Sequence, residues 1–573
     1  MKLKFLYLFL VIFVLTGCTP GSDSNIASSP SPTPTATNTR QQVPSPASNE
    51  TLAPLSLYLA DSLPEDITGH ESLERFQVIK EPDAILWFGP ATEAPEGEIL
   101  SSTTWVYALA APFPTLRDDL LFDDFLSYWQ GYQPESLADV SQLYVPDSFA
   151  HTKRLDWGNP SPTNITLYNN NSHPGIEDLW ETNAWIILPF GDLDTRLKVI
   201  SIDGISPLFK DYNPIDDPLT QSYILAATKA GSEIITDELK DSLISILPAT
   251  NRDPEKLTTL VMTGVTALVR ATAYRMEQHG VLYPGEKIVH WLADADLTHI
   301  SNEVSFYEDC PFPDPRQESL FFCSDPKYIE LLEYIGADII ELTGNHNNDM
   351  LYARGVDVVP FTLDLYDQYG MVYYGGGRDL AEAQTPLLIE HHGNKFAFIG
   401  CNAFGPDFAW ATTTRGGAAP CDDFQWMATE VNRLISEGYL PIATYQYFED
   451  YYNFAVEHHI RDYGLMAEAG AVIVNGSQAH RPKAMAFEHD AFIDYGLGNL
   501  FFDQKWYEDE AGNVIQQTAW VSIQRHTFYD NQHVSIELLT AQLEDFAQPR
   551  PMTETERQVF LDELFTASGW NSR

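Results

Sequence analysis

Short apolar runs alternate with amphipathic stretches along most of the chain. Runs of about four to eight apolar residues between polar or glycine-rich positions are typical of buried strands, and apolar residues spaced by three and four are typical of helices. In the C-terminal half this pattern predicts strands at 257–264, 295–304, 339–342, 371–374, 395–399, 440–444, 471–475 and 534–539, and helices at 327–335, 429–436, 458–469 and 554–565. The repeated order of strand followed by helix predicts an α/β sandwich.

The same alternation covers the N-terminal part of the folded chain. Strand patterns lie at 55–60, 105–111 and 185–189, and an amphipathic helix is predicted at 118–130. These patterns indicate a smaller α/β domain that precedes the larger one. The predicted order is the smaller α/β domain at 54–250, a polar linker at 251–257, the larger domain at 258–545 and a C-terminal tail at 546–573.

Two short pieces of the smaller domain resemble extracytoplasmic solute-binding proteins of the phosphate-binding type. The pieces are residues 111–115 with 129–131, and residues 197–204. They cover fragments of the domain and identify no ligand residue. The alternative is an α/β domain that only packs against its neighbour.

The first residues have the pattern of a bacterial lipoprotein signal peptide. Lys2 and Lys4 precede an apolar run at 5–15, which is too short to span a membrane as a helix of the mature protein. The run ends in Leu-Thr-Gly-Cys18, which resembles a lipobox, so we expect residues 1–17 to be removed and Cys18 to carry lipid. The protein is then expected on the extracytoplasmic face of the cell membrane, anchored by lipid. An ordinary secretory signal with an incidental cysteine is the alternative.

Composition adds a stalk and a strongly acidic surface. Residues 18–53 form a linker rich in serine, proline and threonine. Such a segment cannot bury enough apolar surface to fold, so we expect it to hold the folded part away from the membrane. The formal net charge of the chain is -48, which argues against nucleic acid as a partner and against binding of polyanions over the general surface.

Four cysteines remain besides the lipobox cysteine, namely Cys310, Cys323, Cys401 and Cys421. Because export leads to an oxidising compartment, an even number of cysteines predicts disulfides rather than metal thiolates. Pairing of neighbours, Cys310 with Cys323 and Cys401 with Cys421, is the simplest of the three connectivities. The sequence leaves the other two open.

Polar residues follow predicted strands at four places. Asn345 and His346 come after the strand at 339–342, and Asp349 follows three residues later. The other groups are Asn302 with Glu303, residues 446–450, and residues 476–480. Ligands of open α/β sheets bind at the carboxyl ends of strands, and a two-metal hydrolase collects its ligands from several such loops. Amide, imidazole and carboxylate groups suit divalent metals; four unrelated polar loops are the alternative.

The order and spacing of these groups resemble the CapA-like family, named for capsule and poly-γ-glutamate synthesis, a branch of the metallophosphatase-like fold. The match covers about residues 258–505. It rests on Ala295-Asp296-Leu297 with Asn302-Glu303, Ala337-Asp338 with Asn345-His346 and Asp349, Tyr374 to Gly377, Gly393 to Gly400, Gly470-Ala471 with Gly476 and His480, and Tyr495 to Asp503. The resemblance implies a four-layer α/β/β/α metallophosphatase-like sandwich with a polar or metal-bearing pocket at one edge.

Three parts of the family pattern are changed in this chain. Val265 stands where the family usually has aspartate, and Gln446 stands where it usually has histidine. In the family's Gly-His-His-Pro-His run, Ser477 and Gln478 replace histidines and only His480 is kept. Valine cannot ligate a metal, and a neutral glutamine is a poor substitute for histidine. A full two-metal site is therefore not expected.

The resemblance then implies a reduced site. The expected metal ligands are Asn302, Glu303, Asn345, His346, Gln446 and His480, and the expected catalytic residues are His346, Asp349 and His480. They would hold one divalent metal (Mn, Zn, Mg or Ca). Alternatively, they would hold no metal and would orient a substrate instead. We expect an accessory role in the synthesis or export of a capsule or envelope polymer such as poly-γ-glutamate, with the machinery for that polymer as partner. A metal-dependent phosphoesterase-like hydrolase acting on an envelope substrate is the alternative.

Overall fold

The computed structural model describes residues 55–80, 84–169, 172–244, 246, 248–508 and 511–572. The predicted signal peptide, Cys18 and the linker lie outside these residues. Among the described residues, no helix is both long enough and apolar enough to cross a membrane.

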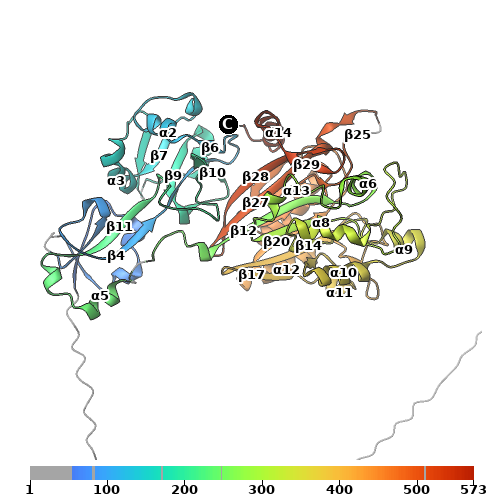
Figure 1. Ribbon diagram of the computed structural model, residues 1–573, viewed down its shortest axis with the longest axis horizontal. Coiled ribbons are helices and arrows are strands. Elements are labelled where there is room, and N and C mark those ends of the chain that lie inside the picture. Colours follow the sequence, from blue (N-terminus) through green and yellow to red (C-terminus); the bar gives the residue numbers. More distant parts are fainter. Residues whose placement is uncertain are drawn as a thin grey trace, which may run out of the picture. The chain divides into compact units, whose positions relative to one another are not determined.

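The smaller N-terminal region contains two sheets and short helices (Figure 1). One sheet has the order β2 (Gln77–Ile79), β1 (Ser56–Leu59), β3 (Leu86–Pro90), β11 (Gln221–Thr228) and β4 (Gly97–Trp105). The other has the order β6 (Asp119–Leu120), β10 (Leu197–Ile202), β5 (Tyr107–Pro112), β9 (Trp185–Pro189), β7 (Leu143–Pro146) and β8 (Ile165–Tyr168). The helices are α1 (Glu65–Thr68), α2 (Phe122–Trp129), α3 (Asp147–Trp157), α4 (Ile176–Thr182) and α5 (Asp237–Ile244). This region is α/β, as the sequence predicts.

The helix predicted at 118–130 begins later than expected. Asp119 and Leu120 pair in parallel with Ser201 and Ile202 of β10, and α2 starts only at Phe122. The amphipathic pattern does not show that the first residues form an edge strand. Local periodicity carries no information about pairing with a strand far along the chain.

The larger region is built on two mixed sheets. The first has the order β15 (Val372–Tyr374), β14 (Ile339–Glu341), β13 (Leu297–Asn302), β12 (Leu257–Thr266), β27 (Trp520–Tyr529), β28 (Gln532–Glu544) and β29 (Gln548–Pro551), and β24 (Asn499–Phe501) also pairs with β12. The second has the order β17 (Leu387–His391), β18 (Asn394–Asn402), β20 (Leu440–Gln446), β21 (Ile473–Asn475), β23 (Ala491–Asp494) and β22 (Met485–Glu488). Strands β12 to β15 run parallel, as do β18, β20, β21 and β23.

Successive residues of the central strands pack into different layers. Ile339 of β14 and Ile442 of β20 belong to one core that joins the two sheets face to face. Their neighbours Ile340 and Ala443 point outward into two other cores, beneath helices. Since side chains alternate between the faces of a strand, strands covered on both faces are largely apolar on both. This explains why they are nearly continuous apolar runs in the sequence.

Helices cover both outer faces. On the first sheet, α6 (Arg270–His279), α8 (Ile329–Tyr334) and α10 (Val359–Tyr369) contribute Met276, Leu331 and Leu363 to the core beneath them. On the second, α12 (Gln425–Ser436) and α13 (Glu457–Ala469) contribute Val431 and Met466. The larger region is therefore the four-layer α/β/β/α sandwich predicted from the sequence.

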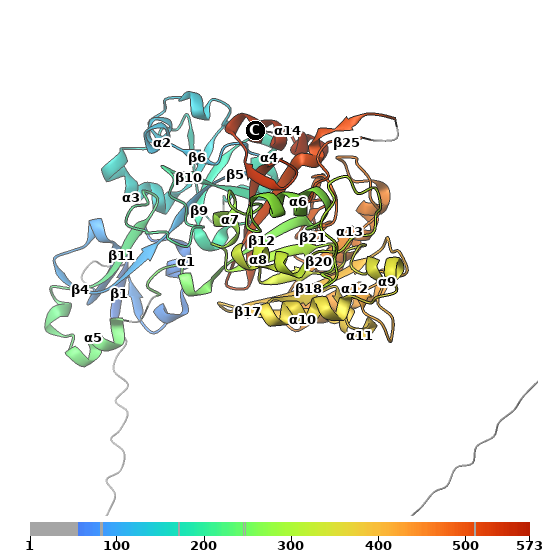
Figure 2. The same ribbon diagram turned by 45° about the vertical axis from the view of Figure 1, so that its right-hand side comes forward.

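Residues 546–573 are predicted as a C-terminal tail, and their described part, 546–572, is built into the fold. They contain β29, which extends the first sheet beside β28, and α14 (Glu554–Ala567). Figure 2 shows α14 beside the C-terminal strands, and its Phe560 and Leu564 are buried in a core with Ile536 and Leu538 of β28. A capping box at Thr553 and Glu556 starts this helix.

Candidate functional site

The predicted polar groups lie where parallel strands end. Asn302 is the last residue of β13, Gln446 is the last residue of β20, and both are fully buried or nearly so. The loop after β14 meets the loop after β20 across the two sheets, since Asn345 donates from Nδ2 to Glu449 Oε1 at 3.2 Å. The strands of both sheets therefore bring their carboxyl ends to one edge, as expected for this architecture.

Three side chains at this edge form a group that suits a metal ion. One ligand atom each from Glu303, Glu449 and His480 lies within 4.8 Å of the other two. Glu303 is 1% exposed, and its Oε1 has no hydrogen-bond partner among the described residues. A buried carboxylate oxygen without a partner is costly, so a bound cation would fit this group on the geometry of the protein itself.

The orientation of His480 also fits a ligand. Its Nδ1 lies 2.9 Å from Asn499 Oδ1, and Asn499 uses its Nδ2 to donate to the carbonyls of His480 and Thr518. The amide oxygen of Asn499 must therefore accept, so Nδ1 of His480 carries a proton and Nε2 faces Glu449 at 3.6 Å. Fixing one imidazole nitrogen in this way is how proteins orient metal-binding histidines.

Without a bound cation, His480 and Glu449 carry opposite charges. Burial, the largest single effect, would raise the pKa of Glu449, but the charges of His480 and His346 and the hydrogen bonds from His480 and Asn345 together lower the pKa to about 2. Burial would likewise lower the pKa of His480, but Glu449, Glu303 and the hydrogen bond to Asn499 together raise it to about 9. For Glu303, burial raises the pKa against the charges of His480 and His346. At neutral pH the site therefore contains a His480–Glu449 ion pair beside a buried Glu303.

His346 is placed next to this group but outside it. Its Nδ1 lies 2.7 Å from Asp349 Oδ2, which also accepts the backbone N–H of Phe322 at 2.7 Å. The ring of Phe322 packs against the imidazole with centroids 4.7 Å apart. Burial lowers the pKa of His346, but its hydrogen bond to Asp349 and the charge of Glu303 raise it overall. His346 and Asp349 thus form a hydrogen-bonded pair that borders the candidate metal group.

The three predicted amide ligands each keep an oxygen without a protein partner. Asn302 donates to Val304 O and to the Tyr366 hydroxyl, and Gln446 donates to Tyr447 O. Oδ1 of Asn302, Oδ1 of Asn345 and Oε1 of Gln446 are buried and have no partner among the described residues. Such oxygens can accept hydrogen bonds from the water molecules of a hydrated cation or from hydroxyl groups of a substrate.

The departures from the family pattern have structural counterparts. Val265 is fully buried and packs with Val304, Phe322 and Phe502. Gln478 is buried and donates to the Ser301 hydroxyl. Apolar packing and an internal hydrogen bond thus occupy positions where the family's pattern has metal ligands.

Glu449 was missed as a ligand by sequence reasoning. It lies in the polar run 446–450, but the family pattern predicts the ligand of this run at Gln446, where the family usually has histidine. The signal that was available is an acidic residue three positions after the end of a buried strand. The partner that makes it significant, His480, is 31 residues away and is brought close only by the fold.

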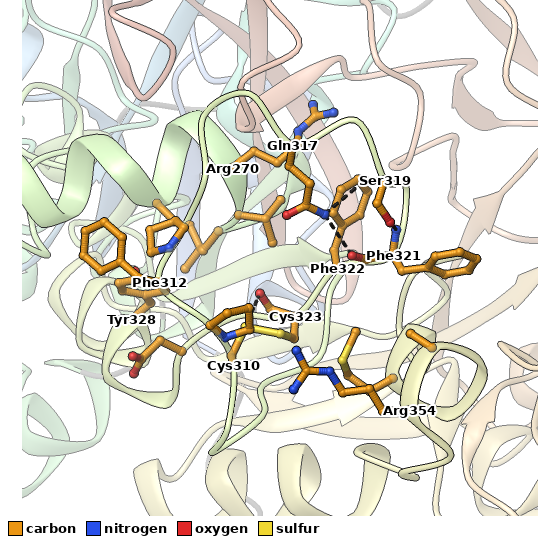
Figure 3. Close-up of a pocket in the computed structure, with 18 residues that line it drawn as sticks. Arg270, Cys310, Phe312, Gln317, Ser319, Phe321, Phe322, Cys323, Tyr328 and Arg354 are labelled. Atoms are coloured by element: carbon orange, nitrogen blue, oxygen red, sulfur yellow. Dashed lines mark hydrogen bonds between the residues drawn. A yellow bond between two sulfur atoms is a disulfide. The ribbon is translucent and has the colours of Figure 1, made fainter.

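The pairing of the cysteines is as the simplest connectivity predicts. Cys310 is bonded to Cys323, and Cys401 to Cys421. The first disulfide closes the loop that carries Phe322, and it also lines a pocket of about 260 Å3 beside Arg270 and Arg354 (Figure 3). Gln317 stabilises this loop by donating hydrogen bonds from its Nε2 to the backbone carbonyls of Ser319 and Phe321. The pocket therefore borders the wall of the candidate site.

Comparison with known proteins confirms the predicted resemblance. Residues 259–504 match the family described as "Bacterial capsule synthesis protein PGA_cap". The chain is 20% identical over 276 residues to "Capsule biosynthesis protein CapA" of Bacillus anthracis. That match covers 48% of this chain and 66% of the relative, so the chain spans just under two thirds of the relative's length. Residues 259–504 are thus similar to the CapA-like family, at low sequence identity.

Solved structures similar to this chain are more distant. An ABC-type phosphate transport receptor from Vibrio cholerae is 13% identical, with a TM-score of 0.27, and the match covers 34% of this chain and 92% of that one. NAD nucleotidase of Haemophilus influenzae is 10% identical, with a TM-score of 0.26, and the match covers 54% of this chain and 56% of that one.

Proposed function

We propose that this CapA-like chain has an accessory role in the synthesis or export of an envelope or capsule polymer and that it holds one divalent cation at Glu303, Glu449 and His480. The family match supports the role in capsule synthesis. The observation that best supports a bound metal is the buried Glu303 carboxylate, whose Oε1 has no hydrogen-bond partner among the described residues. Poly-γ-glutamate is the polymer that the family resemblance implies.

Two carboxylates and one imidazole are a mixed oxygen and nitrogen ligand set. Such sets suit zinc or manganese better than magnesium or calcium, which prefer oxygen ligands alone. A metal bound there would act as a Lewis acid toward a phosphoryl or carbonyl oxygen. The protein's own contribution is to keep His480 in one tautomer through Asn499 and to hold His346 beside the group through Asp349.

The proposal places the protein outside the cytoplasm, anchored by lipid on Cys18. The lipobox pattern and the serine-, proline- and threonine-rich linker support this location. Two disulfides in the larger region are in keeping with an oxidising compartment, because cytosolic proteins rarely retain them.

The metal site is tested by comparing Glu303→Gln with the wild-type protein. Wild type should bind about one manganese or zinc ion per chain, and its melting temperature should rise when the metal is added. A ligand present at a hundred times its Kd stabilises a folded protein by about 2.7 kcal/mol. Glu303→Gln should bind the metal at least about tenfold more weakly, because it loses the charged ligand. Elemental analysis and thermal melts with and without metal measure both effects.

Glu308→Gln is the matched control, since Glu308 is exposed on the loop that follows Glu303. It removes the same charge and should leave metal binding unchanged. Wild-type protein that takes up no manganese or zinc at millimolar concentration would rule out the metal. The His480–Glu449 ion pair would then be the whole of the site.

A metal-dependent hydrolase is the second candidate function. It is favoured by the His346–Asp349 pair, which places an oriented imidazole at the border of the metal group. Val265 argues against this function. It stands where the family usually has an acidic ligand, and it packs among apolar side chains. Metal-dependent hydrolysis of bis(p-nitrophenyl) phosphate that is lost in His346→Gln would favour this function over the accessory role.

A further inference from the structure

We propose that the loops around the candidate site bind a neutral polysaccharide chain through exposed aromatic rings. This inference rests on the proposed function, because it names the chemical class of the polymer that the protein handles. It departs from the poly-γ-glutamate that the family resemblance implies.

Exposed aromatic residues are concentrated at this edge of the molecule. Among the described residues, ten phenylalanine, tyrosine and tryptophan residues stand out as exposed, and seven of them lie within 11 residues after the end of strand β13, β14, β18, β20 or β24. We call these seven the aromatic rim: Phe312, Tyr352, Phe404, Phe448, Tyr452, Phe454 and Trp506. Parallel strands end at this edge, so the rim lies at the same edge as the loops that carry Glu303, Glu449 and His480.

Several rings of the rim are stacked rather than packed at random. Tyr352, which is 66% exposed, stacks on Phe321 with centroids 4.9 Å apart and on Phe408 at 5.2 Å. Tyr452 and Phe454 stack on each other at 5.0 Å, with 22° between their planes. Stacking supports each ring from one side and holds it in a defined orientation. A ring held in this way can receive the apolar face of a sugar.

The rim adjoins the candidate site directly. Phe448 is 52% exposed and precedes Glu449 in the chain. Phe321 precedes Phe322, whose ring contacts His346. In Figure 3, Phe312 and Phe321 lie on opposite sides of the disulfide-lined pocket. At about 260 Å3 this pocket lies just below the range of roughly 300–1,000 Å3 found for drug-sized ligands, so it suits one unit of a chain.

The charge of these loops disfavours an anionic polymer. Residues 303–325, 345–357, 402–424, 446–457 and 502–508 contain sixteen acidic residues, three arginines and one lysine. Three nearby cations are already paired: Arg270 with Asp503, Arg481 with Glu563 and Lys483 with Asp450. A polyanion such as poly-γ-glutamate would be repelled, whereas carboxylates and amide oxygens accept hydrogen bonds from sugar hydroxyls.

The same acidity disfavours a protein partner. The buried centres of protein–protein interfaces are depleted of charged residues and enriched in arginine as well as in aromatic residues. Here aromatic rings alternate with carboxylates, and Leu320 and Val356 are the exposed large aliphatic residues in the described parts of loops 303–325 and 345–357. Alternating rings and hydrogen-bonding groups match a chain of sugars better than an apolar protein surface.

Affinity electrophoresis of the full-length, detergent-solubilised protein tests this inference. Native gels contain dextran, galactomannan or glycol chitin as neutral probes, or poly-γ-glutamate of similar length. At least one neutral polysaccharide should retard the wild-type protein, and poly-γ-glutamate should not. Tyr352→Ala and Tyr452→Ala should each weaken retardation by up to about tenfold, the range expected for an aromatic stacking contact of roughly 0.5–1.5 kcal/mol.

Tyr132→Ala is the matched control, because Tyr132 is exposed to a similar degree but lies in the smaller region. It should leave retardation unchanged, and Tyr352→Ala should still bind metal as the wild type does. Three results would overturn the inference: no retardation by any neutral probe, retardation by poly-γ-glutamate, or an equal loss in Tyr132→Ala. A protein ligand that needs Tyr352 while no polysaccharide binds would also overturn it. None of these results depends on metal binding by Glu303, so the proposed function is judged separately.

Discussion

At the scale of single residues, the site shows how a few substitutions change a metal centre. Val265 and Gln478 each replace a group that could donate to a metal, and each has a new structural partner. Glu303 and His480 are kept, and Glu449 supplies a second carboxylate beside them. The result is a ligand set for one cation, because the positions that would hold a second are filled by apolar contacts and an internal hydrogen bond.

Asp494, the last residue of β23, predicts a pH dependence of stability. It is 1% exposed, and burial raises its pKa to about 7 against hydrogen bonds from Gly496 N–H and Gln524. The folded protein therefore holds this proton up to about pH 7, whereas the unfolded chain releases it near its ordinary value of about 3.9. The stabilisation is present in acid and should be lost as the pH rises to about 7, by about 1.4 kcal/mol per pH unit between those two values.

Asp494→Asn should flatten this slope, since asparagine resembles the protonated carboxyl group. Melting temperatures of the variant and the wild type, measured from pH 4 to pH 8, should differ most in favour of the variant at the highest pH. Asp407→Asn changes an exposed carboxylate and serves as the control. Parallel curves for Asp494→Asn and wild type would show that Asp494 does not retain its proton in the folded protein.

At the scale of elements, one covalently closed loop positions the border of the site. The Cys310–Cys323 disulfide closes the segment after β13, and Phe322 next to it donates its N–H to Asp349. The loop thereby connects the disulfide to the His346–Asp349 pair. Its conformation matters to the site even though neither cysteine touches a candidate ligand.

Replacing both cysteines with serine should loosen this loop. Removing a disulfide that closes about 15 residues costs about 3 kcal/mol in the chain-entropy account. Hydrogen exchange should rise in residues 303–325, and metal-dependent stabilisation should weaken because Phe322 no longer holds Asp349. Hydrogen exchange with mass spectrometry and melts with added manganese measure the two effects.

The second disulfide provides the control for this change. Serine at both Cys401 and Cys421 should also lower the melting temperature, because that pair closes a loop of similar size. It should leave exchange in residues 303–325 unchanged. Equal exchange in that segment for both double variants would mean that the first disulfide has no particular role at the site.

At the scale of the whole molecule, the two regions share a core. Phe113, which follows β5, packs edge-on against Phe487, Phe565 and Trp570 of the larger region. Arg557 of α14 makes two hydrogen bonds to Asp118, each 2.8 Å long. The helix α14 therefore links the smaller region to the sandwich, which a free tail would not do.

The proposed attachment to the membrane would be a property of the whole chain, and it rests on the lipobox pattern at Cys18. Cys18→Ser should block lipid attachment and yield a soluble or unprocessed form, because the thiol is the group that lipid modification requires. Metabolic labelling with a fatty acid and membrane fractionation measure this. A variant that is still fully lipidated would refute the lipobox interpretation and leave an ordinary signal peptide.

The sequence by itself determined the architecture and the loops in which the candidate site lies. Strands buried on both faces are largely apolar along their whole length, so runs such as 257–264 and 440–444 mark the central strands. Glu303, Asn345, His346 and His480 could be found because polar residues at the carboxyl ends of parallel strands are placed at one edge by the sheet itself.

Only the tertiary structure decided which of these side chains meet. Loop paths after each strand set whether a side chain turns toward its neighbours, and contacts between distant segments set those paths. His346 pairs with Asp349, whereas Glu449 joins Glu303 and His480 across the two sheets. The aromatic rim, the pairing of β29 with β28 and the packing of α14 likewise depend on long-range contacts, which local periodicity does not encode.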